Sequence, residues 1–358
     1  MAIKWTILGL FIYTAMALYA GAAALFFAKV RRVAWVLYGT GCAVAVAAWT
    51  YRWFQAEHIP LQNLFEVCLT LGWLIFPITL FGRRFLDVGV EGGDAVIGLL
   101  ILFPVGFVFS GEPKMLMPAL QSFLFVPHVA AYMLAYVVMG KAAVQALGAY
   151  SVKTRLAMLV YVLPRLGLMV YLFKARQHPV TPALAETVSA SAETAWSAVG
   201  CLLLPATLAL RDMGRRFFEM DGLWYLGPGL VADLLFWASI ALLLWRARPV
   251  PQGQRLEAER DGHVVTRLGF PLLTLGLVLG AVWGKIAWGD YWNWDPKELW
   301  SLVSWLVFLG YLHVRYMHGK RFPRLNCALA VLGLAAIVLT LLWVNLARIF
   351  GGGLHSYA

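Results

Sequence analysis

The feature that most constrains this chain is a series of apolar runs that approach the length needed to cross a lipid bilayer. Of its 358 residues, 61% are hydrophobic and only 13% are charged. A soluble domain cannot bury that much apolar surface, and a membrane-spanning helix needs about 20 consecutive apolar residues. A membrane barrel would instead give short alternating segments. The sequence therefore predicts an all-α, polytopic integral membrane helical bundle with about ten transmembrane helices in the lipid bilayer.

The apolar runs divide the chain into three parts. We expect five spans in residues 1–150, an inserted membrane segment of unknown role in 151–250, and three spans in 251–358. Within 154–245, two of three apolar stretches must span, and the third is interfacial or re-entrant. A polar cytoplasmic link is expected at 249–267. The eight spans outside the insertion are expected at 5–28, 33–54, 64–81, 95–109, 123–150, 268–282, 300–314 and 326–346.

Positive charges at the ends of these runs predict their orientation. The formal net charge is +11, but the basic residues stand in short clusters at span ends, as the positive-inside rule expects. This pattern argues against a nucleic-acid partner. It predicts that both termini lie outside. The first three inner ends are marked by Lys29, Arg31 and Arg32, by Arg83 and Arg84, and by Lys153 and Arg155.

A tryptophan-rich stretch, residues 283–300, stands between two of the expected spans. It reads WGKIAWGDYWNWDPKELW and holds five of the sixteen tryptophans. Tryptophan gathers at membrane interfaces, which accounts for two or three of them. The tryptophans beyond that number predict a wide outer aromatic loop that holds a large, flat, apolar ligand. The candidate binding residues are Trp283, Trp288, Trp292, Trp294 and Trp300.

Two acidic residues in this stretch have an alternative interpretation. Asp295, Pro296 and Glu298 have the spacing of a helix start, with Asp295 at the N-cap and Glu298 at the reciprocal capping position. Capping is the simpler role for both. Asp295 also remains a candidate ligand-binding residue, and Glu298 a candidate support behind the ligands.

Three histidines are candidates for haem iron ligation. His128 and His355 are expected at the outer ends of their spans, on the same side as the tryptophans. Two imidazoles on one side of an aromatic surface are suited to be the axial ligands of a haem iron. His313 is expected near the inner end of its span, on the order of 20 Å from the other two. An ionisable group at membrane depth indicates function, so His313 predicts a second, inner site that needs a partner.

The other histidines carry weaker signals. His58 is expected on the outer side, either as support for the outer site or as a brace for the Pro60 turn, and the structural role is favoured. His178, His263 and His318 lie in polar connecting segments, where exposed histidines without a special role are expected.

Several stretches together resemble a known family. The block WGDYWNWDPKE is similar to the signature of the WWD-domain haem-handling superfamily. Together with EHIPLQNLFE, LQSFLFVPHVAAYMLAY, WLVFLGYLHVR and VNLARIFGGGLHSYA, it resembles the System II cytochrome c biogenesis proteins of the CcsA/ResC type. The resemblance covers residues 50–140 and 265–358. The part from 151 to 245 matches nothing in the family.

The resemblance implies a function and a ligand set. His128 and His355 match the family's external haem ligands, and His313 matches its inner haem ligand. The second inner ligand would come from a partner subunit of the CcsB/ResB type. The resemblance implies that the chain is a subunit of a holocytochrome c synthase (haem lyase). It moves haem b outward as substrate and ligand and attaches it to CxxCH motifs of apocytochrome c. The location implied is a bacterial inner (cytoplasmic) membrane or a thylakoid-type membrane. No side chain is assigned a catalytic role with certainty.

Three other functions remain open at this stage. A b-type electron-transfer subunit keeps its haem, usually between histidines at matched depth on neighbouring helices. Histidines at span ends favour a transient external site instead. A System I-like haem chaperone would share the tryptophan signature, and a transporter of another substrate would not require histidines on the aromatic side.

Overall fold

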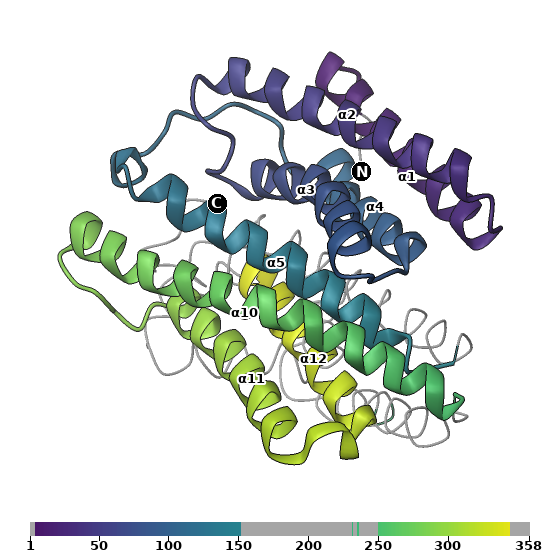
Figure 1. Ribbon diagram of the computed structural model, residues 1–358. Coiled ribbons are helices and arrows are strands. Elements are labelled where there is room, and N and C mark those ends of the chain that lie inside the picture. The colour runs from purple at the N-terminus through teal and green to yellow at the C-terminus, as the bar shows by residue number, and fades with distance from the viewer. Residues whose placement is uncertain (1–3, 152–230, 232–234, 236–249, 344–358) are drawn as a thin grey trace. The chain divides into compact units, whose positions relative to one another are not determined.

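The computed structural model describes residues 4–151 and 250–343, together with positions 231 and 235. This described part is helical and contains no strand, which confirms the predicted fold class (Figure 1). The chain divides into two compact units, and the helices described below belong to the unit that includes Met1–Ala149 and Gly253–Leu342.

Each of the eight spans expected outside the insertion corresponds to a helix, and most boundaries agree within a few residues. The first five helices are α1 (Ile7–Phe27), α2 (Arg31–Ala56), α3 (Leu64–Phe85), α4 (Glu91–Phe107) and α5 (Phe125–Leu147). The later ones are α10 (Gln252–Trp288), α11 (Pro296–His318) and α12 (Pro323–Val338). Short turns of helix lie at η1 (Pro118–Gln121), η3 (Gly319–Arg321) and η4 (Leu339–Trp343).

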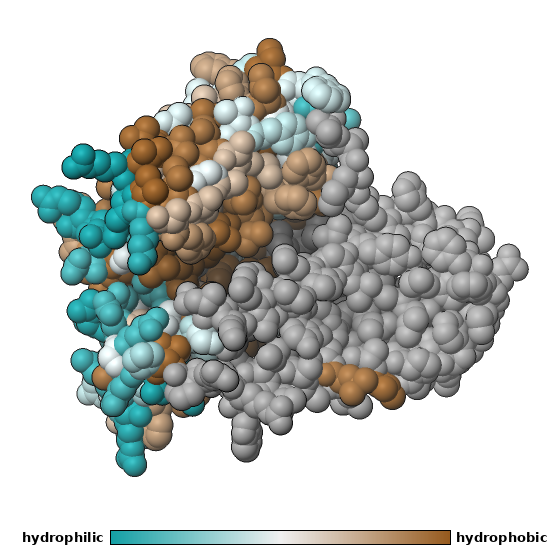
Figure 2. Space-filling model, turned by 90° about the vertical axis from the view of Figure 1, so that its right-hand side faces the viewer, coloured by the Kyte–Doolittle hydropathy of each residue, from teal (hydrophilic) through white to brown (hydrophobic). Residues whose placement is uncertain are grey.

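Six of the described helices are long and apolar enough to cross a membrane: α1, α2, α3, α5, α10 and the segment Pro323–Leu341 that contains α12. Figure 2 shows a broad hydrophobic area on the coloured upper part of the molecule, bordered by hydrophilic residues. These features establish a multi-span helical membrane protein. The total of ten spans stays a prediction, because α4 and α11 are not among these six and the two remaining expected spans fall in 154–245, of which only positions 231 and 235 are described.

The prediction of a polar link at 249–267 is wrong for most of that segment. Helix α10 is continuous over 37 residues and includes this segment from Gln252 onward. The segment is rich in good helix formers, namely Gln, Arg, Leu, Glu and Ala. It also buries one face, because Ala258, Gly262 and Val265 are covered in the structure. Counting only polar residues missed this buried stripe.

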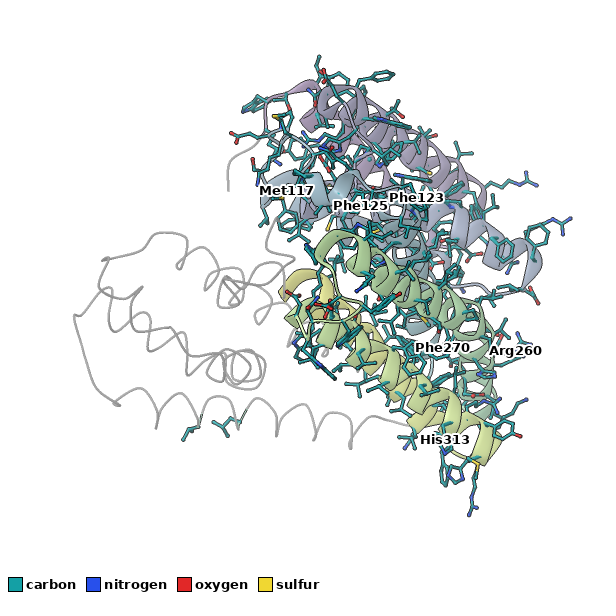
Figure 3. The ribbon with its side chains drawn as sticks, turned by 90° about the vertical axis from the view of Figure 1, so that its left-hand side faces the viewer. Met117, Phe123, Phe125, Arg260, Phe270 and His313 are labelled. Carbon is teal, nitrogen blue, oxygen red and sulfur yellow. The ribbon has the colours of Figure 1, made fainter. Side chains whose placement is uncertain are left out.

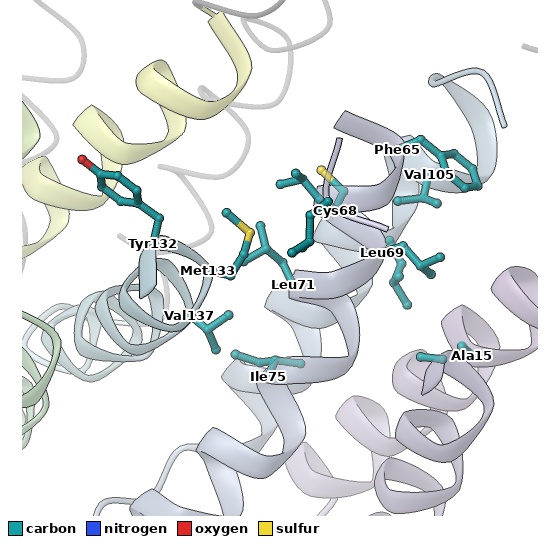
Figure 4. Close-up of a cluster of buried hydrophobic side chains, with 14 of the residues drawn as sticks. Ala15, Phe65, Cys68, Leu69, Leu71, Ile75, Val105, Tyr132, Met133 and Val137 are labelled. Carbon is teal, nitrogen blue, oxygen red and sulfur yellow. The ribbon is translucent and has the colours of Figure 1, made fainter. Parts of the chain in front are cut away.

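Helix α5 lies between the N-terminal helices and α10 (Figure 1). Met133 and Val137 point from α5 toward Leu71 and Ile75 of α3, and all four side chains are buried (Figure 4). Tyr132 points to the opposite side of α5 (Figure 4). One helix thus contributes to two interfaces.

Small residues set the contact between α5 and α10. Gly262, Gly269 and Gly276 recur every seven residues along α10. A Cβ atom at these glycines would lie 3.3 Å from the Ala142 carbonyl oxygen, 2.9 Å from Met139 Sδ and 3.0 Å from the Tyr132 ring, respectively. Small residues let membrane helices approach closely and pack by van der Waals contact. The antiparallel order of these contacts brings the beginning of α5 to the end of α10.

Two basic ends that were expected on the inner side meet in the structure. Arg31 Nη2 lies 2.6 Å from Glu91 Oε1, and Arg83 Nε lies 3.7 Å from the same oxygen. The start of α2, the end of α3 and the start of α4 therefore share one end of the bundle. The side of the membrane that this end faces stays a prediction.

A buried ion pair near this end gives a stability prediction. Lys141 Nζ lies 2.5 Å from Asp94 Oδ2, and both side chains are almost fully buried. Lys141→Met leaves a buried carboxylate without its cation, so we expect a loss of about 3–5 kcal/mol in the free energy of unfolding. Lys141→Met with Asp94→Leu should lose much less, because no buried charge remains. Unfolding titrations in detergent micelles measure both, and equal losses would contradict this account.

Candidate functional site

The tryptophan-rich stretch is more helical than expected. Helix α10 continues through Trp288, and α11 begins at Pro296, so only residues 289–295 connect them. The prediction of a wide loop over 283–300 is therefore wrong in its extent. The helix ends where Gly289 adopts a φ of +92°, a left-handed conformation that glycine adopts at no steric cost.

The expected helix start at Asp295 is confirmed. The Lys297 backbone N–H donates to Asp295 Oδ1 at 2.9 Å. Glu298 Oε2 accepts from the backbone N–H groups of Asp295 at 3.2 Å and Asn293 at 2.8 Å. This is a capping box, which satisfies donors at the helix start reciprocally. Both acidic side chains thus anchor the short connection between α10 and α11.

The five tryptophans occupy different positions. Trp283 is buried, and its ring meets Trp288 edge-on with centroids 4.7 Å apart. Trp292 and Trp294 form a second edge-on pair on the connection, 6.0 Å apart, and 69% of Trp294 is exposed. Trp300 is half-buried on α11. The pair at the end of α10, with Trp283 buried and Trp288 half-buried, is therefore followed by a more exposed pair on the connection.

His128 lies directly against the first pair. Its ring stacks on Trp283 with centroids 5.6 Å apart and an interplanar angle of 20°. Tyr132, one turn further along α5, meets the imidazole edge-on at 5.2 Å. The expected proximity of His128 to the tryptophan-rich stretch is thus present in the structure.

The α10 backbone fixes the state of this imidazole. His128 Nδ1 lies 2.9 Å from the Gly276 carbonyl oxygen. A carbonyl only accepts hydrogen bonds, so Nδ1 carries a proton, and in the neutral imidazole Nε2 then carries the lone pair. A histidine that binds a metal usually donates its other N–H in this way, which sets the tautomer and the ring orientation. The donor set and the aromatic neighbour therefore suit an axial ligand of haem iron.

His58 contacts two backbone carbonyl oxygens. Nδ1 lies 3.0 Å from Ile59 O, and Nε2 lies 3.2 Å from Lys114 O. These contacts hold the turn before α3 and the segment after α4. They agree with the favoured structural role, in which His58 braces this turn.

His313 lies at the other end of the bundle. Figure 3 shows it near Arg260, far from Met117, Phe123 and Phe125. Its side chain is exposed, and no hydrogen bond to another described residue is present. A ligand that His313 binds would therefore sit on the exposed face of α11, where a second protein can reach it.

The helix that carries His313 is anchored by buried polar groups. Arg315 forms an ion pair with buried Glu259 of α10. Asn326 of α12 donates to the same Glu259 carboxylate at 3.1 Å.

The remaining histidines differ in exposure. His263 is half-buried, with Nδ1 3.3 Å from the Tyr311 hydroxyl, so the prediction that it is exposed is wrong. His318 is exposed, as expected. His178 and His355 lie outside the described residues.

The sequence interpretation missed one further cluster, where the end of α2 meets the start of α3. Arg52 Nη2 lies 2.8 Å from Glu66 Oε1, and both side chains are fully buried. Lys4 and Arg52 both stack on the Phe65 ring. Burial, together with the Arg52 guanidinium, lowers the pKa of Lys4 to about 8. The available signal was the presence of charged residues within apolar runs.

The packing of His128 gives a prediction at Gly280. A Cβ atom there would lie 2.5 Å from His128 Cε1 and 3.0 Å from Nδ1. We expect Gly280→Ala to lower the free energy of unfolding by roughly 1–3 kcal/mol, because it overpacks this contact. Gly140 of α5 has nothing within 4 Å of its added Cβ, so Gly140→Ala should add about 0.5–1 kcal/mol through helix propensity. Unfolding titrations test the pair, and a stabilised Gly280→Ala variant would contradict the geometry.

Comparisons with known proteins agree with these features. A family model described as "Cytochrome C assembly protein" matches residues 231–350. Proteins named "Cytochrome c biogenesis protein CcsA" match most of the chain. The Microcystis aeruginosa protein is 30% identical over 89% of this chain and 86% of its own length. The Crocosphaera subtropica protein is 32% identical over 86% and 82%. The Synechocystis protein is 29% identical over 90% and 89%. The chain therefore belongs to the CcsA family of cytochrome c biogenesis proteins.

Proposed function

We propose that this protein presents haem b on the outer side of the membrane and supports its covalent attachment to CxxCH motifs of apocytochrome c. It would act as the CcsA-type subunit of a System II cytochrome c synthase. Membership of the CcsA family implies a part in cytochrome c maturation. The observation that carries the finer proposal is the placement of His128, oriented by Gly276 and stacked on Trp283.

The outer site is proposed to hold haem between His128 and His355, beside the tryptophan-rich stretch. With Nδ1 donating to the Gly276 carbonyl oxygen, Nε2 of His128 is the nitrogen that would bind iron. Trp288, Trp292, Trp294 and Trp300 would supply the apolar surface for the porphyrin. Buried Trp283 would support His128, and Asp295 would anchor the connection. Two neutral imidazoles favour low-spin iron and leave the porphyrin edge accessible from outside.

The attachment reaction requires little chemistry from the protein. A cysteine S–H adds across a vinyl C=C bond, so that one C–S and one C–H bond form and no outside oxidant is needed. Haem supplies the vinyl groups, and the apocytochrome supplies the thiols. The protein must hold the two reactants in a fixed relative orientation, which is the main source of acceleration in such a case.

An inner site is proposed at His313. Its exposed position on α11 is compatible with a second haem ligand from a CcsB/ResB-type partner. His313 and Phe125, which is close in sequence to His128, lie far apart in the bundle, and this separation supports two distinct sites (Figure 3). Haem would be taken up at the inner site and passed to the outer one.

The outer ligand can be tested with His128→Ala. We expect outer haem occupancy to fall by about tenfold or more and cytochrome c maturation to be lost, because an iron ligand is removed. His263→Ala is the matched control, since His263 is also half-buried but lies near the opposite end. Absorption spectra of the protein purified with its partner measure the occupancy. An unchanged spectrum in His128→Ala would reject this ligand.

The inner ligand can be tested with His313→Ala. We expect haem to be depleted at both sites, because loading at the inner site precedes export. His318→Ala is the matched control, since it is an exposed histidine on the same helix. Haem content and a maturation assay measure the effect. Normal haem and normal maturation in His313→Ala would exclude an inner site at this residue.

A further inference from the structure

The segment between α4 and α5, residues 109–121, is held by side chains rather than by regular backbone pairing. We call it the outer strap. Five of its first seven carbonyl oxygens lie within hydrogen-bond distance of side chains from other segments. The contacts are Lys4 Nζ to Phe109 O, 2.5 Å; Arg52 Nη1 to Gly111 O, 2.6 Å; Arg52 Nη2 to Glu112 O, 3.2 Å; His58 Nε2 to Lys114 O, 3.2 Å; and Gln62 Nε2 to Met115 O, 2.9 Å.

The Arg52–Glu66 pair is central to these contacts with the strap. Arg52 donates from Nε and Nη2 to Glu66 Oε1, at 3.1 and 2.8 Å, while Nη1 and Nη2 reach the strap. Glu66 Oε2 accepts the backbone N–H of Gln62 at 2.9 Å. A fully buried pair gains little net stability, because desolvation offsets the attraction, and such pairs can instead specify one geometry. The planar guanidinium suits this task, since it directs several donors at fixed angles.

The far end of the strap contacts the proposed haem site. The Ala119 carbonyl oxygen accepts the Trp283 indole N–H at 3.2 Å. Trp283 in turn stacks on His128. Leu120 of the strap is buried in the same cluster as Trp283 and Phe125. Only three residues lie between Ala119 and Met115, whose carbonyl oxygen is the last of the five that side chains from other segments hold. A shift of the strap would therefore be passed on to Trp283.

We propose that Arg52 and Glu66 are positioning residues for the outer haem ligand, acting through the strap on Trp283 and His128. This inference rests on the proposed function of His128. It adds that a charged pair, which touches neither His128 nor the tryptophan-rich stretch, determines whether the imidazole stands in the geometry that binds iron.

The chain contains a matched control pair. Asp94 and Lys141 form a comparably buried ion pair near the opposite end of the bundle. Lys141 also donates to the Gly89 carbonyl oxygen at 3.3 Å, which is not part of the strap. Asp94→Asn therefore removes one buried carboxylate charge, as Glu66→Gln does, without altering the strap.

The test compares Glu66→Gln with Asp94→Asn in the full chain purified with its partner. We expect Glu66→Gln to weaken outer haem binding by about tenfold or more, the range typical of residues that orient metal ligands. The outer haem should shift from low-spin to high-spin, while the inner haem remains. Asp94→Asn should leave the spin state of the outer haem unchanged. Equal spectral changes in both variants, or none in Glu66→Gln, would overturn the positioning role.

Two further variants keep the outcome decisive. Trp283→Phe removes the hydrogen bond to Ala119 but keeps an aromatic ring. If both substitutions act through the strap, the double variant with Glu66→Gln should lose less outer haem affinity than the product of the two single losses. Independent, multiplying losses would overturn the proposal. Where Glu66→Gln does not fold, Gln62→Leu releases Met115 and should give the same spectral change at smaller amplitude, and a spectrum like that of the unmodified protein would overturn it. His128→Ala, measured in parallel, identifies failure of the ligand assignment itself.

Discussion

The close approach of α5 and α10 is the contact on which the rest of the site depends. Glycines at positions 262, 269 and 276 bring the α10 backbone against α5, and the same seam ends where Gly280 meets the His128 ring. Because the backbone is so near, the Gly276 carbonyl can accept the His128 Nδ1 proton. A bulkier seam would separate the helices, and the imidazole would lose both its orienting acceptor and its contact with Trp283.

Buried charges act at both ends of this seam. At the end near His128, Arg52 and Glu66 hold the strap that contacts Trp283. At the other end, Glu259 joins Arg315 on α11 to Asn326 on α12. Ion pairs in such environments contribute geometry more than net stability. The two proposed haem sites therefore share a design in which a histidine lies near buried polar groups that fix the helix or strap beside it.

Much of this arrangement could be predicted from the sequence. Apolar run length located the eight helices, and the capping pattern located the start of α11 at Pro296. The polar segment before residue 268 was misjudged, because its buried stripe of small residues is invisible to a count of charges. The aromatic loop was overestimated for a related reason, since Trp283 and Trp288 continue a helix. His263 was expected to be exposed, and only the packing of α10 against α11 shows its contact with Tyr311. The Arg52–Glu66 grip depends on contacts between segments about 60 residues apart, which no local pattern encodes.

The central claim is that His128 binds the iron of the outer haem as a neutral imidazole, paired with a second imidazole. Near-infrared magnetic circular dichroism of the full chain, purified with its partner, identifies the axial ligands of low-spin haem directly. The account predicts a bis-imidazole signature for the outer haem that disappears in His128→Ala and persists in His263→Ala. A signature of a different ligand pair in the unmodified protein, or one that His128→Ala leaves unchanged, would contradict it.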